Sequence, residues 1–141
     1  MRRLGRPVRP GRLFRNLVVR PLCAPSFGGF WRLWNPPYCY VLLYYVYRPA
    51  RRRLPHPAAL YLTFLVSGLF LHDIPANLPD VARGRVPSLT GTALFAIFGA
   101  VAVASDWLGV DLSRRPAWVR GAANVALLIA GFSLRRLFVT H

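Results

Sequence analysis

The stretch that decides the fold is "PHPAALYLTFLVSGLFL", residues 55–71, because none of its seventeen side chains carries a formal charge. An α-helix rises about 1.5 Å per residue, so this run would be about 25 Å long, against about 30 Å for the hydrocarbon core of a bilayer. His72 and Asp73 follow it directly. The stretch therefore predicts a membrane-spanning helix at about residues 56–72.

Two further apolar runs predict two more spanning helices. Residues 86–105 carry no charge over twenty positions, and residues 121–134 carry none over fourteen. The shorter run is flanked by arginines, whose long side chains can reach from the edge of the hydrocarbon layer to the headgroups. We therefore expect spans at about 87–107 and 118–137, and an all-α membrane protein.

The composition also favours a membrane location. The chain has 141 residues, a net charge of +15 and 55% hydrophobic residues, a combination that is rare in a small soluble domain. All nineteen basic residues are arginines, and most of them precede residue 55. The positive-inside rule then predicts a multi-pass integral membrane protein with a cytoplasmic N-terminus and, after three spans, a C-terminus outside. We expect no nucleic-acid partner, because the apolar runs are too long for a small soluble nucleic-acid-binding domain.

Residues 1–25 are predicted to form a basic cytoplasmic arm ahead of a membrane domain at residues 26–141. The first twenty residues contain seven arginines and no acid. Anionic lipid headgroups attract such a segment by about 1 kcal/mol per basic residue near the surface. Pro7 and Pro10 should prevent a long helix there, because proline lacks a backbone N–H donor.

Residues 30–47 are predicted to form an interfacial or re-entrant helix. Their apolar part, "YCYVLLYYVY" at residues 38–47, would be only about 15 Å long as a helix and cannot span alone. Tyrosine side chains favour the headgroup boundary. A kink is expected at Pro36 and Pro37, and the arginines that follow Tyr47 should return the chain to the cytoplasmic face.

His72 is the strongest candidate for chemistry among the ionisable residues. A histidine near the membrane interior is uncommon and by default marks a functional site, and its imidazole suits general-base work near neutral pH. The alternative is that His72 merely ends its helix at the interface. Ser67 lies five positions earlier and is not expected on the same helix face, so a serine nucleophile activated by His72 is not supported. His56 and His141 are expected to be solvated.

Asn35 is the second candidate, within "FWRLWNPPYCY" at residues 30–40. Trp31, Trp34 and the tyrosines would ordinarily form an aromatic belt at the membrane surface, which needs no carboxamide. An asparagine before proline is also an ordinary helix cap or turn residue. Local sequence alone leaves both interpretations of Asn35 open.

In their order and spacing, these motifs resemble the signature part of the membrane-bound O-acyltransferase family, and most of all its sterol and diacylglycerol acyltransferases and wax-synthase-like members. Asn35 precedes His72 by 37 positions, an interval similar to that of the family. The resemblance covers roughly residues 26–80, and the pair Pro36-Pro37 and the extra Leu71 depart from the family pattern. The matching residues are Phe30, Trp31, Trp34, Asn35, Tyr47, Arg48, Pro49, Arg51 to Arg53 and Ser67 to Asp73.

The resemblance implies transfer of an acyl group from a thioester donor, such as acyl-coenzyme A, to the hydroxyl group of a lipid acceptor. His72 would be the general base, and Asn35 would donate a hydrogen bond to the donor or to the developing oxyanion. The implied substrate-binding residues are Trp31, Trp34, Arg48, Arg51 and Arg52, the arginines being placed to hold the phosphates of the coenzyme. No other cofactor is implied. No metal is expected either, because Cys23 and Cys39 lack the spacing of metal ligands.

Three hypotheses follow for the role of the chain. It is either a minimal acyltransferase or one half of a site that a partner subunit or a homo-oligomer completes. Alternatively, it is a truncated, non-catalytic relative of the family that binds lipid or a partner. The third hypothesis is a basic membrane-surface adaptor that is unrelated to the family.

Overall fold

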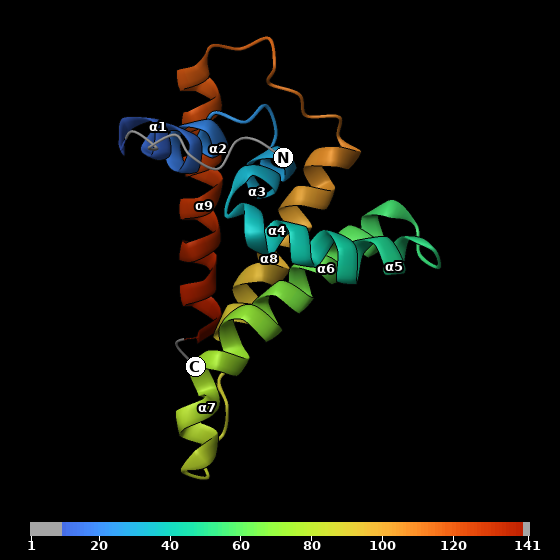
Figure 1. Cartoon of the computed structure of the whole chain (residues 1–141), viewed down its shortest axis with the longest axis vertical. Helices are drawn as coiled ribbons and strands as arrows, with labels where there is room; N and C mark the ends of the chain where they lie inside the picture. Colours follow the sequence, from blue (N-terminus) through green and yellow to red (C-terminus); the bar gives the residue numbers. More distant parts are fainter. Residues whose placement is uncertain (1–9, 140–141) are drawn as a thin grey trace, which may run out of the picture.

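The computed structural model describes residues 10–139, so the first nine residues of the predicted basic arm lie outside the described part. Every regular element within residues 10–139 is helical, which confirms the all-α fold (Figure 1). Three helices in this part are long and apolar enough to cross a membrane, as the charge-free runs predict. They comprise His56–Ala82, Thr90–Trp107 and Ala117–Leu137.

The described part begins with a short helical segment that carries several of the N-terminal arginines. It runs without a break through α1 (Pro10–Phe14), the π-helical turn η1 (Arg15–Val19) and α2 (Arg20–Leu22). The expectation that Pro10 prevents a long helix is therefore wrong. Pro10 starts the helix instead, because the first turn of a helix needs no backbone N–H donor at that position.

The predicted interfacial helix at residues 30–47 is two helices in the structure. The first is α3 (Phe27–Leu33), and the second comprises α4 (Pro36–Leu42), the π-helical turn η2 (Leu43–Tyr47) and α5 (Arg48–Arg51). We call residues 36–51 the aromatic helix. Asn35 separates the two helices with a left-handed φ of 48°, a conformation that asparagine tolerates better than most residues. The break thus lies at the predicted kink, and the helix continues four residues beyond its predicted end.

Each of the three π-helical turns ends two residues before a proline. Val19 precedes Pro21 in this way, Tyr47 precedes Pro49, and the third pair is Asp73 and Pro75. Proline lacks the N–H for an α-helical bond, and its ring clashes with the carbonyl group four residues earlier. A π-helical turn widens the helix at that carbonyl, so the prolines are accommodated without ending the helix.

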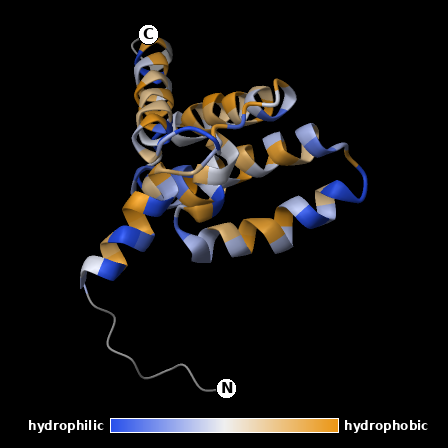
Figure 2. Ribbon diagram, turned by 90° about the horizontal axis from the view of Figure 1, so that it is seen from above, coloured by the Kyte–Doolittle hydropathy of each residue, from blue (hydrophilic) through white to orange (hydrophobic). Residues whose placement is uncertain are grey.

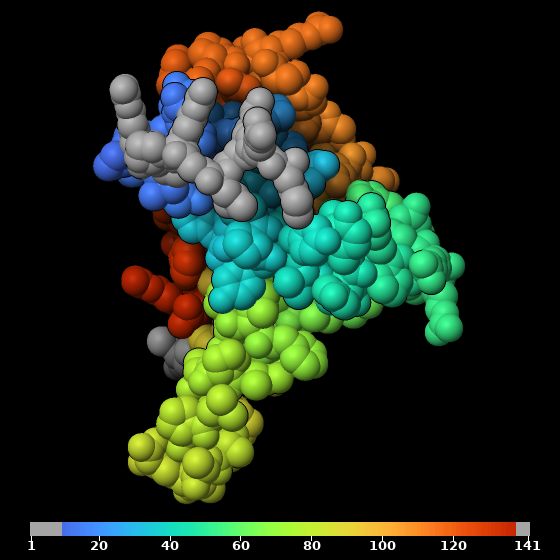
Figure 3. All heavy atoms as spheres, viewed as in Figure 1, coloured from blue at the N-terminus to red at the C-terminus, as the bar shows by residue number. Residues whose placement is uncertain are grey.

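The first spanning helix continues past the predicted boundary at His72 and Asp73. It contains α6 (His56–Gly68), the π-helical turn η3 (Leu69–Asp73) and α7 (Ile74–Ala82). The expectation that this helix ends near residue 72 is therefore wrong, because η3 absorbs the break that proline would cause. Figures 1 and 3 show α7 projecting beyond the other helices.

Helix α8 (Thr90–Trp107) packs antiparallel against α6 with unusually close backbones. A Cβ atom on Gly68 of α6 would lie 2.7 Å from Thr92 Cα, and one on Gly99 of α8 would lie 2.9 Å from Phe64 Cβ. Only glycine fits such an approach, as at other interfaces between membrane helices that use small residues.

The core lies among α3, α6 and α8. It consists of phenylalanines from α3, α6 and α8 with small or branched residues around them, namely Ala24, Phe27, Phe30, Phe64, Leu94, Phe95, Phe98 and Ala102. Helix α9 (Ala117–Val139) packs on this core less extensively, and Asn124 joins it to the N-terminal helices by donating to Leu22 O and Ala24 O at 2.7 and 3.1 Å. Figure 2 shows hydrophobic residues along α6, α8 and α9, as expected of helices that face lipid.

A substitution at Gly68 tests the close packing of α6 against α8. The Gly68→Ala change should lower the free energy of unfolding by about 1–3 kcal/mol, because the added methyl group meets backbone atoms that cannot move aside. Reversible unfolding of the purified chain in mixed detergent measures the effect.

Gly121→Ala provides the matched control, because a Cβ atom there would lie 3.9 Å from Cys23 Sγ, an ordinary contact. This change should leave stability unaltered or raise it by up to about 1 kcal/mol, since alanine favours the helix. Equal effects of the two substitutions would contradict the predicted packing.

Candidate functional site

His72 lies on the π-helical turn η3, and its side chain is exposed. The ring packs on Phe95 of α8 with 4.5 Å between centroids, and Nδ1 lies 3.2 Å from the carbonyl oxygen of Ser67. A carbonyl oxygen only accepts hydrogen bonds, so Nδ1 carries the proton that forms this bond. Nε2 therefore keeps its lone pair in the neutral ring, and it has no hydrogen-bond partner within residues 10–139. These features leave Nε2 able to take a proton from a bound molecule.

Asp73, the neighbour of His72, is a structural residue that caps α8. Its buried carboxylate accepts hydrogen bonds from the backbone N–H of Gly91 at 2.7 Å and from that of Thr92 at 2.6 Å. The hydroxyl group of Thr92 donates a third bond at 2.6 Å. The first N–H groups of a helix have no partner within it, and a negative charge also favours its N-terminus. Asp73 thus fixes the turn that carries His72 against the start of α8.

Asn77 extends this polar contact by one helical turn. Its Nδ2 donates to Asp73 O and to Ser88 O, both at 2.7 Å, and its Oδ1 accepts from the backbone N–H of Ser88 at 2.7 Å. The carboxamide is buried and forms both kinds of hydrogen bond. The connection that leads from α7 back to α8 is therefore tied to the same helix that carries His72.

Asn35 lies at the break between α3 and the aromatic helix, with an exposed side chain. Its backbone carbonyl accepts from the N–H of Cys39 at 3.2 Å, which begins the aromatic helix. The carboxamide caps no helix and makes no hydrogen bond to any residue in the described part. Asn35 is therefore free to contact a molecule that binds from outside.

The two tryptophans predicted to bind substrate lie in different environments. Trp31 packs among the core phenylalanines, with its ring centroid 5.4 Å from that of Phe95 and 5.2 Å from that of Phe98. Its buried indole nitrogen has no hydrogen-bond partner in the described part. Trp34 is exposed and stacks on Phe30 at 5.5 Å. A substrate-binding role for either tryptophan stays a prediction.

Phe95 connects the two halves of the predicted catalytic pair. The ring of His72 contacts it, and so does the ring of Trp31, which lies about one helical turn before Asn35. The structure records no contact between the side chains of Asn35 and His72. The predicted pair therefore flanks one aromatic core without meeting in it.

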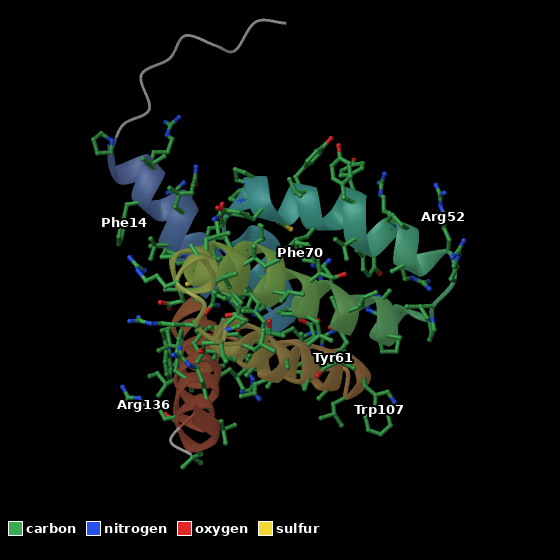
Figure 4. All side chains as sticks on the ribbon, turned by 90° about the horizontal axis from the view of Figure 1, so that it is seen from below. Phe14, Arg52, Tyr61, Phe70, Trp107 and Arg136 are labelled. Carbon is green, nitrogen blue, oxygen red and sulfur yellow. The ribbon has the colours of Figure 1, made fainter. Side chains whose placement is uncertain are left out.

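The arginines at the C-terminal end of the aromatic helix and in the turn after it lie at the other end of α6 from His72. Arg48 stacks on the ring of Tyr44, 4.2 Å from its centroid, and Arg51 donates to Leu54 O at 2.9 Å. Arg52 lies at the turn that joins the aromatic helix to α6 (Figure 4). His72 lies sixteen positions after His56, an interval that corresponds to about 24 Å along a helix. Phosphates bound at these arginines would thus lie far from His72.

His56 forms a polar cluster that sequence reasoning missed. Its Nδ1 lies 2.7 Å from the hydroxyl oxygen of Tyr47, and its Nε2 lies 3.3 Å from Asp106 Oδ2. Its side chain keeps 48% of its surface exposed, as expected, but the two contacts were not expected. His141, the other histidine expected to be solvated, lies outside the described residues. The cluster joins the aromatic helix to α6 and the C-terminal end of α8.

The capping role of Asp73 also went unrecognised, as did the hydrogen bonds of Asn77 and Thr92. The available signal was the pair Asp73 and Asn77, two polar residues four positions apart next to an apolar run. Such spacing places both on one helix face and suggests a tertiary polar contact. Their partners could not be identified, because Thr92 lies nineteen positions beyond Asp73 and Ser88 lies eleven positions beyond Asn77.

Neither of two hollows formed by the described residues includes Asn35 or His72. The larger is an open groove of about 750 Å³ between the aromatic helix and α6, and the smaller, of about 250 Å³, is lined partly by Asp106 and Asp111. No group of three or more His, Cys, Asp or Glu that could hold a metal occurs in the part of the chain that the structure describes.

Replacement of Asp73 tests its capping role. Asp73→Ala should lower the free energy of unfolding by about 2–3 kcal/mol, because it leaves N–H groups at the start of α8 without a partner. Asp80→Ala is the control, since Asp80 makes only an exposed contact to Arg85 at 3.3 Å. Its effect should stay below about 1 kcal/mol. Similar losses in both variants, measured by unfolding in mixed detergent, would rule out the cap.

Cys39, on the aromatic helix and outside the spanning helices, offers a test by pH. Burial raises the pKa of its thiol above the ordinary value, and the positive charge of Arg32 offsets part of this rise. Less thiolate is then present at pH 8 than in a free cysteine. In a Cys23→Ser chain, the rate at which an alkylating reagent modifies the Cys39 thiol should still increase with pH above pH 9.0. The rate at which the same reagent modifies glutathione should level off at lower pH. If the rates for Cys39 and for glutathione depended on pH in the same way, the burial of Cys39 would be contradicted.

No family model, no curated protein and no solved structure matches the chain. The similarity to membrane-bound O-acyltransferases rests on the quoted motifs and on their spacing, so membership of that family stays a prediction.

Proposed function

We propose that the chain takes part in membrane-bound acyl transfer, from a thioester donor such as acyl-coenzyme A to the hydroxyl group of a lipid acceptor. His72 acts as the general base. The observation that carries the proposal is the hydrogen bond from Nδ1 of His72 to the carbonyl of Ser67, which leaves an exposed Nε2 lone pair on a membrane-spanning helix. An ionisable group in such a helix marks a functional site by default.

In the proposed reaction, Nε2 of His72 takes the proton of the acceptor hydroxyl as its oxygen attacks the thioester carbonyl. The tetrahedral intermediate collapses with loss of the sulfur, and the imidazolium returns the proton to the leaving thiolate. An ester and a free thiol result. General-base catalysis of this kind contributes about 10²–10⁴-fold to the rate.

Asn35 supports the reaction as a hydrogen-bond donor. Its carboxamide is exposed and unpartnered within the described residues, so its NH₂ group can approach the thioester carbonyl oxygen. Donation to the developing oxyanion stabilises the transition state more than the ground state. Since Asn35 and His72 do not meet within the described part, we infer that a second chain or a second copy completes the site.

The arginines constrain how a donor would bind. Arg52 is exposed, whereas Arg48 and Arg51 already contact Tyr44 and Leu54. A donor with its phosphates at this turn must extend along α6 to bring its thioester to His72. The proposal therefore requires an elongated donor rather than a compact one.

One observation favours a second function, that of a non-catalytic membrane protein related to the family. The outer face of α9 exposes a row of large apolar side chains, of which Ile129 is 61% and Phe132 is 49% exposed. Such a face suits contact with lipid or with a partner helix. In this case the chain would bind a partner without catalysing acyl transfer.

Turnover in native membranes of the producing cell separates the two functions, because any completing chain is then present. We expect His72→Gln to reduce ester formation from labelled acyl-coenzyme A by at least about 10²-fold. Asn35→Asp, which removes the NH₂ donor and keeps the side-chain shape, should reduce it by about 10²–10³-fold.

His56→Gln serves as the matched control, because His56 lies at the opposite end of α6 and is outside the proposed site. This variant should retain most of the turnover. If His72→Gln membranes retain the same activity as those of the unmodified chain, His72 has no role as a base. If deletion of the whole chain leaves acyl transfer unchanged, the non-catalytic function is favoured.

A further inference from the structure

The aromatic helix and α6 enclose an open groove of about 750 Å³ with largely apolar walls. Val46 and Ala50 line it from the aromatic helix, and Leu62 and Val66 line it from α6. No acidic residue lines this groove. An apolar groove on the side of a membrane-spanning helix is suited to a hydrocarbon chain supplied by the bilayer.

Two arginines stand at the end of this groove, next to the turn that joins its walls. Arg52 and Arg53 both line it and both are exposed. Neither guanidinium group forms a hydrogen bond or an ion pair with any residue of the described part. Their neighbours Arg48 and Arg51 are engaged by Tyr44 and by Leu54 O. The unengaged guanidinium groups thus lie where the apolar walls end, and Figure 4 shows Arg52 at the tip of the turn.

We propose that the groove binds one anionic phospholipid, with an acyl chain between the aromatic helix and α6 and the phosphate on Arg52 and Arg53. A guanidinium group can donate two parallel hydrogen bonds to a phosphate. The positive end of the groove complements the phosphate of such a lipid, and the apolar walls complement its acyl chain.

The surroundings place the phosphate of this lipid at headgroup level. The aromatic helix exposes four tyrosines, a residue type that concentrates at the membrane boundary, namely Tyr38, Tyr40, Tyr44 and Tyr45. The neighbouring arginines are the kind of basic cluster that attracts anionic lipid next to a spanning helix. A soluble phosphate compound would leave the apolar walls uncovered, so the bilayer lipid fits the groove better.

This lipid site does not depend on acyl transfer. Neither His72 nor Asn35 lines the groove. Lipid binding is measured without turnover, so it can hold or fail whatever the outcome for the proposed acyltransferase.

Native mass spectrometry of the purified full chain with an equimolar mixture of phosphatidylglycerol and phosphatidylcholine tests the site. We expect phosphatidylglycerol to be retained about twenty-five-fold over phosphatidylcholine, from about fivefold for each of the two arginines. Arg52→Gln combined with Arg53→Gln should abolish this preference. Val66→Trp, which fills the groove, should reduce the retention of phosphatidylglycerol while leaving both arginines in place.

The matched control is Arg114→Gln with Arg115→Gln, which removes the same charge from two adjacent exposed arginines that do not line the groove. This control should keep the preference. An equal loss of preference in both double variants would overturn the proposal, because it would indicate attraction by net charge alone. Displacement of phosphatidylglycerol by soluble glycerol 3-phosphate would overturn it as well, by identifying a free phosphate compound as the occupant.

Discussion

The carboxylate of Asp73 is the interaction on which the arrangement of the other helices depends. It accepts three hydrogen bonds from Gly91 and Thr92, and so joins the end of the first spanning helix to the start of the second. Gly91 must be glycine here, because a Cβ atom would lie 2.6 Å from Asp73 Oδ1. At the other end of this helix pair, His56 contacts Asp106 at 3.3 Å. The antiparallel pair α6 and α8 is thus joined by polar contacts at both ends and by glycine contacts between them.

The candidate site depends on the way the chain accommodates proline. Pro75 produces the π-helical turn that presents His72 and turns Asp73 toward α8. The same relation between proline and a π-helical turn recurs before Pro49, next to the arginines of the groove proposed to bind lipid. A π-helical turn ahead of a proline thus shapes both the surface proposed for acyl transfer and the groove proposed to bind lipid. Widened turns of this kind are often found at functional sites.

Sequence reasoning identified the elements better than their ends and contacts. Charge-free runs predicted the three spans, because the thickness of a bilayer limits the length of an apolar helix. Pro36 and Pro37 predicted the kink. The end of the first span was wrong, because apolar periodicity does not show that a π-helical turn absorbs Pro75. The contacts of His56 and Asp73 could not be predicted, since their partners lie 50 and 18 positions away and depend on the register of α6 against α8.

The central claim is that the fold holds His72 as a base with a free Nε2. Solid-state or solution NMR of the chain with ¹⁵N-labelled histidine tests this most directly, and the spectrum of His72→Gln identifies the signals of His72. The account predicts that the neutral ring of His72 is protonated at Nδ1 and unprotonated at Nε2, as required for donation to Ser67 O. A neutral ring protonated at Nε2, or equal populations of the two tautomers, would contradict it.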